Sequence, residues 1–412
     1  IISGIADEES GYECFYRHPK KELNNVCYFK GEQEVQYFIN DVKKELKDKT
    51  FVNQFIKYIK PKIRTEKQEE YINIVKKFFE KDFEFEFTVF KDDCIVNPLI
   101  PVFQFRGPRW IGQIIETPIT NIINGRTGLN TQVHLNKATA FQKDIVEGNR
   151  KSENWSIYLD MLRKRVIEYR MSTDVPLMDA SFRRAAGEKI AVKTAEISME
   201  YCLNGTSNLR ALRVSPFIKA HMVGGTMAHS YIMSYETELR AFQVWNEIFP
   251  NTSFLVDTFD TIKAVRKIVR NNLKPKNVRI DSGDFFTVCQ EVRDILDENG
   301  WNDVGIYISG DLTPELLTEL TTKKVPFDQA MIGTKLTNLG EIVNINPGFV
   351  YKLVEYTRDG KKYYPVKKAS GKGNYPGLKE VIVENGKLHI KPGFGFVNPN
   401  LIIENMEVIN DF

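Results

Sequence analysis

Four short apolar runs in the middle of the chain each end in residues that can bind or polarise phosphate groups. The runs at 254–256, 278–280, 305–308 and 329–332 lead into "DT", "DSGD", "SGD" and "GTK", respectively. A single such end would carry little information, because Asp and Gly are common turn formers. Four in series are informative, since parallel α/β folds build their active sites at the carboxyl ends of the strands.

The residue types at these ends narrow the chemistry. "SGD" and "GTK" place backbone N–H groups without side-chain bulk where helices begin, an arrangement that binds phosphate. The nearby aspartates suit Mg²⁺ or a developing positive charge. The chain contains no GxxxxGK[ST], GxGxxG or GxSxG motif, which disfavours a P-loop, a dinucleotide fold and a serine hydrolase. The pattern predicts a phosphorylated substrate and a cationic transition state.

The stretch "GGTMAHS" (224–230) carries one of only five histidines in the chain, His229, at the predicted start of a helix. One interpretation is a helix cap, in which Thr226 or Ser230 accepts backbone hydrogen bonds and His229 has no role. The other is a catalytic imidazole at the mouth of a phosphate site. Taken by itself, the stretch favours the cap.

The elements that position these residues follow from the spacing of the apolar runs. Their first residues are separated by 24, 27 and 24 positions, and the helical pattern at 261–269 occupies one of the gaps. Pro314 suits the first turn of another helix. Strand and helix alternating at this period predict parallel βαβ units. The pattern alone fits a barrel or a doubly wound sheet equally well.

The two ends of the chain differ from the middle in their pattern of helix and strand signals. Helical patterns at 32–47 and 65–81 precede alternating strands at 83–90 and 102–106, and Asp-Gly and Asn-Gly hairpin signals appear after 344. We therefore expect an α+β domain over 1–115, completed by a β-rich segment at 345–412. The catalytic α/β barrel-like domain is expected over 116–344.

Composition excludes several classes of protein. The 412 residues carry a net charge of only +3 and are 42% apolar, which gives no indication of a nucleic-acid partner. No apolar run is long enough to span a membrane, and no secretory signal opens the chain. Five widely spaced cysteines without a CxxC pair predict free thiols in a reducing, cytoplasmic environment.

Several motifs together resemble the nicotinate phosphoribosyltransferase family. In chain order they are "ETPITNIING", "MDASFRRAAG", "NGTSN", "GGTMAHSYIMSY", "LVDTFDT", "VRIDSGD", "YISGDL" and "MIGTKLTN". Each is weak alone, but the combination is specific and covers about 101–377. The resemblance implies an incomplete α/β (TIM-like) barrel plus an α+β domain built from both termini. It also implies a homodimer with active sites at the subunit interface.

The resemblance further implies an activity, the entry step of NAD salvage. Nicotinate and phosphoribosyl diphosphate would give nicotinate mononucleotide and pyrophosphate, with Mg²⁺ as cofactor and ATP as co-substrate. His229 matches the histidine that ATP phosphorylates in the family. The alternatives are a nicotinamide phosphoribosyltransferase and a non-catalytic nucleotide-binding barrel. Ser207 stands where the nicotinamide enzyme has Asp, and a neutral residue does not repel a carboxylate, which favours nicotinate.

The other site residues are carried over by matching the same motifs. The ribose and the Mg²⁺–pyrophosphate group are expected near Arg279, Asp281, Ser282, Gly283 and Asp284; Mg²⁺ would be bound through the substrate pyrophosphate, with Asp281 and Asp284 as the candidate protein ligands. The 5′-phosphate is expected near Ser309, Gly310, Gly333 and Thr334. The base is expected near Thr206, Ser207 and Asn208, and anionic groups near Arg183 and Arg184. Lys367 and Lys372 match a lysine-bearing stretch of the family or form a plain basic loop.

The chain departs from the family pattern in two places. Ala180 and Ser181 occupy the positions of a Phe-Gly pair whose ring stacks on the pyridine, and Phe182 is displaced by two residues. We expect either that Phe182 takes over the stacking or that the base pocket is altered. The family's Asp-x-Tyr motif is expected to precede Ile1.

Overall fold

A computed structural model describes residues 1–18, 21–365, 375–384, 387–397 and 407–410. Its larger unit is built on a six-stranded, entirely parallel sheet with the order β7-β6-β11-β10-β9-β8. The strands are β6 (Leu177–Asp179), β7 (Gly205–Thr206), β8 (Ser253–Leu255), β9 (Asn277–Ile280), β10 (Gly305–Ser309) and β11 (Gln329–Ile332). The sheet curls into a half-barrel, as the predicted incomplete barrel requires.

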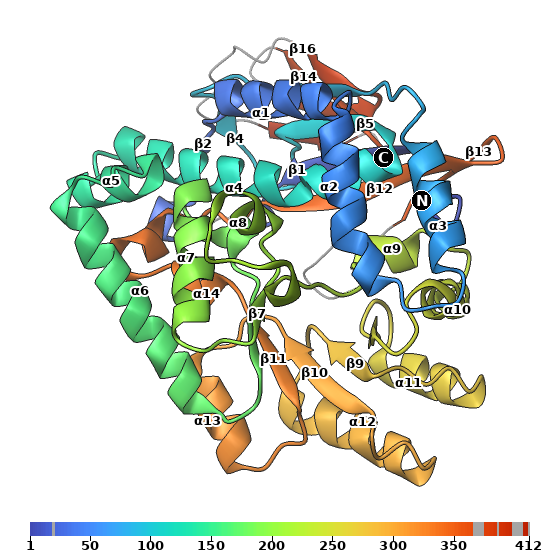
Figure 1. The fold of residues 1–412 in the computed structure, drawn as a ribbon. Coiled ribbons are helices and arrows are strands. Elements are labelled where there is room, and N and C mark those ends of the chain that lie inside the picture. Colours follow the sequence, from blue (N-terminus) through green and yellow to red (C-terminus); the bar gives the residue numbers. More distant parts are fainter. Residues whose placement is uncertain (19–20, 366–374, 385–386, 398–406, 411–412) are drawn as a thin grey trace.

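Helices connect these strands and cover the outer face of the sheet (Figure 1). The βαβ connections from β8 to β11 are α11 (Thr261–Arg270), α12 (Phe285–Glu298) and α13 (Pro314–Thr322). The other helices of this unit are α5 (Ala140–Glu147), α6 (Glu153–Ser172), α7 (Glu188–Glu200), α8 (Leu209–Val214), α9 (His229–Met233), α10 (Glu238–Ile248) and α14 (Thr334–Thr337). The apolar runs that predicted the strands, such as Phe254 and Ile306, are fully buried in the core.

The second unit is an antiparallel sheet with the order β13-β12-β1-β5-β3. Its strands are β1 (Glu9–Phe15), β3 (Glu86–Val89), β5 (Phe103–Pro108), β12 (Val350–Arg358) and β13 (Lys361–Tyr363). Because β1 pairs with both β5 and β12, the two ends of the chain share one sheet, as expected. Asp359 and Gly360 both have positive φ, which fits the predicted Asp-Gly hairpin.

Smaller elements surround this sheet. The C-terminal strands β14 (Lys379–Glu384), β15 (Lys387–Pro392), β16 (Gly395–Val397) and β17 (Glu407–Asn410) form a second sheet, and β2 (Cys27–Tyr28) pairs with β4 (Ile95–Val96). The N-terminal helices are α1 (Glu32–Glu45), α2 (Lys49–Ile59) and α3 (Gln68–Phe78). Helix α2 was not predicted. Within the described ranges, no helix is both long and apolar enough to cross a bilayer.

The long helix α4 (Arg109–His134) runs between the two units (Figure 1). Two glycines allow its backbone to approach its neighbours closely. A Cβ at Gly128 would lie 1.4 Å from the carbonyl oxygen of Ile345, and one at Gly125 would lie 2.7 Å from that of Ala186. The domain boundary predicted between 115 and 116 falls inside this helix, and the exact boundaries stay a prediction.

Candidate active site

A cleft of about 760 Å³ opens at the carboxyl ends of β9, β10 and β11. Eleven of the predicted site residues line it: Arg183, Arg184, His229, Asp281, Ser282, Gly283, Asp284, Ser309, Gly310, Gly333 and Thr334. Arg17 and His18, which follow β1, and several residues of the segment 346–352 also line the cleft. The structure thus brings the four strand ends and the histidine motif together in space.

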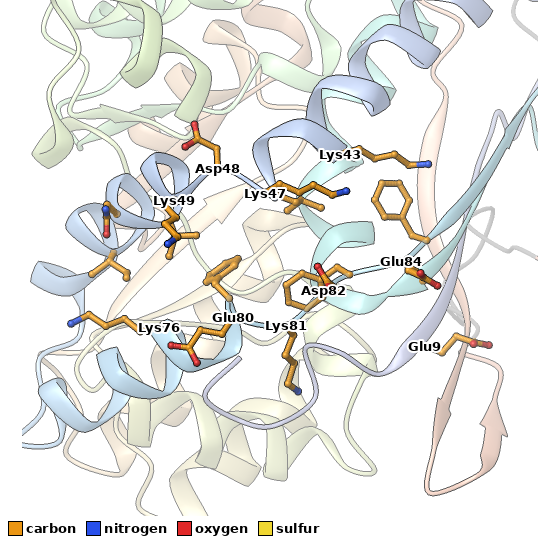
Figure 2. Close-up of a pocket in the computed structure, with 18 of the residues that line it drawn as sticks. Glu9, Lys43, Lys47, Asp48, Lys49, Lys76, Glu80, Lys81, Asp82 and Glu84 are labelled. Atoms are coloured by element: carbon orange, nitrogen blue, oxygen red, sulfur yellow. The ribbon is translucent and has the colours of Figure 1, made fainter.

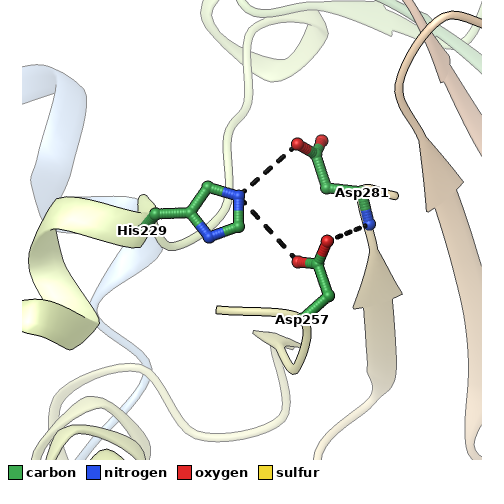
Figure 3. A group of neighbouring side chains, drawn as sticks. All are labelled: His229, Asp257 and Asp281. Carbon is green, nitrogen blue, oxygen red and sulfur yellow. Dashed lines mark hydrogen bonds and ion pairs between the residues drawn. The ribbon is translucent and has the colours of Figure 1, made fainter. Parts of the chain in front are cut away.

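His229 is the first residue of α9, and its ring lies between a hydroxyl and two carboxylates. Nδ1 is 3.2 Å from Thr258 Oγ1, while Nε2 is 3.4 Å from Asp281 Oδ2 and 3.9 Å from Asp257 Oδ1 (Figure 3). The His229 side chain is 17% exposed. Both polar edges of the imidazole are therefore engaged, and a bare helix cap does not account for this placement.

The two carboxylates are held by different sets of donors. Asp257 Oδ2 accepts from the backbone N–H of Asp281 and from the Ser282 hydroxyl, at 3.0 and 2.9 Å. Asp281 Oδ1 accepts from the Ser309 hydroxyl at 2.5 Å. Although burial alone would raise the pKa of Asp281, hydrogen bonds from His229 and Ser309 and the positive charge of Arg279 hold that pKa well below its usual range. Asp281 is consequently an anion at neutral pH.

Arg279 contacts Asp281 and the segment that precedes His229. It does not line the cleft; its guanidinium donates to the hydroxyl of Thr226 and lies 3.9 Å from Asp281 Oδ1. Thr226 belongs to the "GGTMAHS" stretch, so this bond fixes the segment that leads into His229. Arg279 therefore acts through its neighbours in this structure.

Two glycines shape the loops predicted to hold phosphate. Gly283 and Gly310 have φ of +104° and +133°, conformations that favour glycine. A Cβ at Gly310 would also lie 3.0 Å from the carbonyl oxygen of Asp281. Asp284 caps α12, with one oxygen accepting from the Phe286 N–H and the other from the Thr287 hydroxyl. The backbone at these turns is left accessible to a ligand.

The two arginines sit on a short 3-10 turn, η3 (Phe182–Arg184), which α4 holds in place. The Asn121 amide donates to the carbonyl oxygens of Phe182 and Ala185, at 2.8 and 2.7 Å. Arg184 donates to the Phe349 carbonyl oxygen at 2.8 Å, and burial, with the nearby Arg183 charge, lowers its pKa to about 10. Arg183 is half-exposed and pairs with Glu116 at 3.3 Å. The "ETPITNIING" motif therefore positions the arginines.

Other predicted site residues lie away from the cleft. Phe182 is only 8% exposed and packs in the core, so it does not offer its ring for stacking. Thr206 is buried and donates to Asp179, a carboxylate whose pKa burial raises, and buried Asn208 caps α8. Ser207 does not line the cleft. Of the Phe-Gly positions, Ala180 lines the cleft whereas Ser181 is buried. Lys367 and Lys372 fall outside the described residues.

Several site residues were not assigned from the sequence. Asp257 lies two residues after β8, in the "DT" strand end that the sequence analysis singled out, but it was not assigned to the site. Arg17, His18, Asp311 and Lys352 also line the cleft. The antiparallel sheet brings Arg17 and Lys352 to the cleft by pairing distant parts of the chain. A local sequence pattern therefore could not predict that they line it.

A larger hollow of about 1330 Å³ lies beside α2, α3 and β3 (Figure 2). Its charged lining is evenly divided, with six cations (Lys43, Lys47, Lys49, Lys76, Lys81 and Arg106) and six acids (Glu9, Asp48, Glu80, Asp82, Glu84 and Glu86). Lys81 pairs with Asp7, and Lys43 lies over the ring of Phe85. This mixed lining does not resemble a catalytic centre.

Comparisons with known proteins point to one family, although no protein-family model matches the chain. The nicotinate phosphoribosyltransferase pncB2 of Mycobacterium tuberculosis is 34% identical over 215 residues, which cover 50% of this chain and 44% of that protein. The chain thus matches less than half the length of this relative. The nicotinate phosphoribosyltransferase of Bacillus subtilis is 25% identical over 387 residues, which cover 92% of this chain and 69% of that protein.

Solved structures give the same fold. The nicotinate phosphoribosyltransferase of Porphyromonas gingivalis superimposes with a TM-score of 0.59 at 16% identity, covering 90% of this chain and 91% of that one. The enzyme of Vibrio cholerae gives a TM-score of 0.58, also at 16% identity, covering 90% of this chain and 85% of that one. The fold agrees with these structures, and the aligned relatives are nicotinate phosphoribosyltransferases, the family that the sequence motifs resemble.

Proposed function

We propose that this protein forms nicotinate mononucleotide and pyrophosphate from nicotinate and phosphoribosyl diphosphate, with ATP hydrolysis, in NAD salvage. The observation that carries the proposal is the imidazole–carboxylate cluster in a cleft that also holds four permanent cations. These cations are Arg17, Arg183, Arg184 and Lys352. They suit an anionic substrate with several phosphate groups, whereas Asp281 suits the positive charge that develops on the ribose.

The transfer breaks the bond between the ribosyl carbon and a pyrophosphate oxygen and forms a bond from that carbon to the ring nitrogen of the base. The electron pair of the broken bond leaves with pyrophosphate. Arg183 and Arg184 would stabilise the departing anion, and the ionised carboxylate of Asp281 would stabilise the oxocarbenium-like carbon. Catalysis of this kind is mainly electrostatic and depends on the placement of these groups before the reaction begins.

The cluster also fits the Mg²⁺ ion that the family resemblance implies. Ligand atoms of His229, Asp257 and Asp281 lie within 4.8 Å of one another. Asp257 Oδ1 is buried and has no hydrogen-bond partner within the described part of the chain. Because Mg²⁺ prefers oxygen ligands, Asp257 and Asp281 would hold it rather than the imidazole. Asp284, the other predicted ligand, uses both oxygens to cap α12. Bound Mg²⁺ would neutralise pyrophosphate charge.

ATP would take part in the reaction by phosphorylating His229. The γ-phosphoryl group would move to a ring nitrogen, ADP would leave, and water would later cleave the P–N bond. With Nε2–H donating a hydrogen bond to Asp281, Nδ1 would accept from the Thr258 hydroxyl and keep the lone pair that attacks phosphorus. A helix dipole adds little to this step, because α9 has only five residues. The carboxylates and cleft cations therefore dominate the electrostatics.

Experiments can distinguish two other functions from the proposed one. A nicotinamide enzyme would prefer the neutral base, and a non-catalytic nucleotide-binding barrel would bind phosphoribosyl diphosphate without turnover. The family resemblance also supports a homodimer in which the partner subunit completes each cleft. We favour the nicotinate enzyme because the cleft has four permanent cations against three carboxylates.

The decisive experiment is a product assay with nicotinate, nicotinamide and quinolinate side by side, with and without ATP. We expect product with nicotinate, and faster formation when ATP is present. His229→Ala should abolish acid-labile phosphate from ATP yet retain some ATP-independent transfer, because the phosphate loops remain. Preference for nicotinamide would reject the proposed substrate, and label that is stable to acid would point to Ser230 instead.

A further inference from the structure

A chain of hydrogen bonds crosses helix α4 and leads from the cleft to the residue beside His229. Arg183, which lines the cleft, donates to Glu116 Oε1 at 3.3 Å. The amide nitrogen of Gln113 donates to Glu116 Oε2 at 3.0 Å, and the Ser230 hydroxyl donates to the amide oxygen of Gln113. Gln113 and Glu116 lie three residues apart on α4, so they share one face of the helix.

The direction of these bonds is fixed by the chemistry of the carboxylate. An ionised Glu116 can only accept hydrogen bonds, so Gln113 must turn its NH₂ group toward Glu116. Its carbonyl oxygen then faces Ser230, which must donate. Glu116 thereby orients the Gln113 amide, and this orientation determines what Ser230 can bind. An apolar residue of the same length at 113 would remove both bonds.

Helix α9 depends on such outside contacts for its position. It is a short helix that starts at His229, and its N-cap residue, Ala228, provides no side-chain hydrogen bond. At its end, the backbone oxygen of Ser234 accepts from Arg358 at 2.7 Å, and Ile232 is buried in the core. At its start, next to the imidazole, Ser230 bonds to Gln113. The Gln113 contact therefore ties the turn that carries His229 to α4.

We propose that Gln113 is a positioning residue for His229. Acting through Ser230 and oriented by Glu116, it holds the first turn of α9 so that the imidazole stays between Thr258 and Asp281. The consequence for phosphoryl transfer rests on the proposed function, because transfer to His229 needs the ring nitrogen aligned with the γ-phosphorus. A displacement of about 1 Å at a reacting atom can cost on the order of a hundredfold in rate.

The test observes the imidazole directly, so that it does not depend on activity. In protein labelled with ¹⁵N-histidine, five imidazoles give signals, and His229→Gln identifies those of His229. We expect Gln113→Leu and Ser230→Ala to shift the His229 ring-nitrogen resonances in the same way, and the double variant to add nothing further. Ser230→Thr keeps the hydroxyl and should resemble the wild type. The matched control is Gln290→Leu, which removes a Gln–carboxylate bond on α12.

The same variants are then assayed for phosphate incorporation from ATP. Gln113→Leu and Ser230→Ala should slow it by about tenfold to a hundredfold, with the ATP concentration at half-maximal rate changed by less than about threefold, since only alignment is altered. Unshifted His229 resonances in folded Gln113→Leu overturn the proposal, as does additivity in the double variant. If Gln113→Leu does not fold, Ser230→Ala against Ser230→Thr decides. A wild type that takes no label rejects the ATP coupling, while the resonances still decide the positioning role.

Discussion

Two clusters of charged side chains, one in each unit of the molecule, differ in how fully their hydrogen-bonding groups are used. In the antiparallel unit, buried Lys379 donates to Glu13, to the Gly377 carbonyl and to the Tyr375 carbonyl, at 2.6, 2.6 and 3.2 Å. Gln104 donates to the second oxygen of Glu13 at 3.1 Å. In the half-barrel, Asp257 Oδ1 is buried and accepts no hydrogen bond within the described ranges, and the Asp281 side chain remains 30% exposed.

The difference separates a structural role from a functional one. A buried network in which every donor and acceptor is paired fixes the structure around it and leaves nothing for a ligand. A cluster in which one buried carboxylate oxygen accepts no hydrogen bond, and another carboxylate lines a cleft, keeps the capacity to bind a ligand or an ion. The Glu13–Lys379 pair joins β1 to β14 and therefore ties the start of the chain to its C-terminal segment.

The largest effect expected from this comparison is on stability. Lys379→Met leaves Glu13 buried without its cation, and breaking a buried pair in this way costs about 3–5 kcal/mol. Urea unfolding should show a lower midpoint with a similar slope. The double variant with Glu13→Leu should recover part of the loss, because the uncompensated charge is gone. An unchanged midpoint in Lys379→Met would contradict the structural role of the pair.

The matching change in the half-barrel should affect activity more than stability. Asp281→Asn keeps the size of the side chain but removes the anion that the proposed function places beside the ribosyl carbon, so kcat/KM should fall about 10²- to 10³-fold. The free energy of unfolding should change by about 1 kcal/mol, since the side chain is partly solvated. Steady-state kinetics and urea unfolding measure the two effects. The control is Asp303→Asn, an exposed aspartate paired with Lys274, which should leave both unchanged. If Asp281→Asn lost stability but kept its activity, Asp281 would have the structural role that we assign to the Glu13–Lys379 pair.

The pH dependence of stability offers a finer test of the same carboxylate. The folded-state pKa of Asp281 is depressed, so its contribution is present above its unfolded pKa of about 3.9 and disappears as the pH falls toward the folded value. The roughly 1 kcal/mol advantage of the wild type over Asp281→Asn should therefore be present at pH 7 and shrink below about pH 4. Urea titrations at both pH values measure it. An advantage that grows on acidification would mean that the pKa is raised instead.

The sequence predicted most of the half-barrel because its strands repeat at a regular spacing as buried apolar runs. It missed β6 and β7, because these short strands lie outside the regularly spaced series and form through their pairing in the sheet. Helix α2 was missed although Asp48 caps it. In the site, the strand ends were predicted from local pattern. Lys352 was not, because it reaches the cleft only through the pairing of β12 with β1.

The smallest expected effect concerns base selectivity, where the sequence and the structure lead to different expectations. From the motif alone, Ser207→Asp should weaken nicotinate binding at least tenfold, about 1.4 kcal/mol, through like-charge repulsion. In the structure the backbone N–H of Ser207 donates to the Asp179 carbonyl at 2.8 Å, and the side chain does not line the cleft. We therefore expect less than a tenfold effect.

Ala180→Asp provides the matched comparison, because Ala180 lines the cleft and a carboxylate there would face the substrate directly. It should weaken nicotinate binding at least tenfold, about 1.4 kcal/mol, and change nicotinamide binding much less, since the neutral base carries no repelled charge. KM and inhibition constants for both bases, measured for both variants, give the ordering. Weaker nicotinate binding in Ser207→Asp than in Ala180→Asp would place the base at the "NGTSN" motif and move the selectivity filter away from the turn that replaces Phe-Gly.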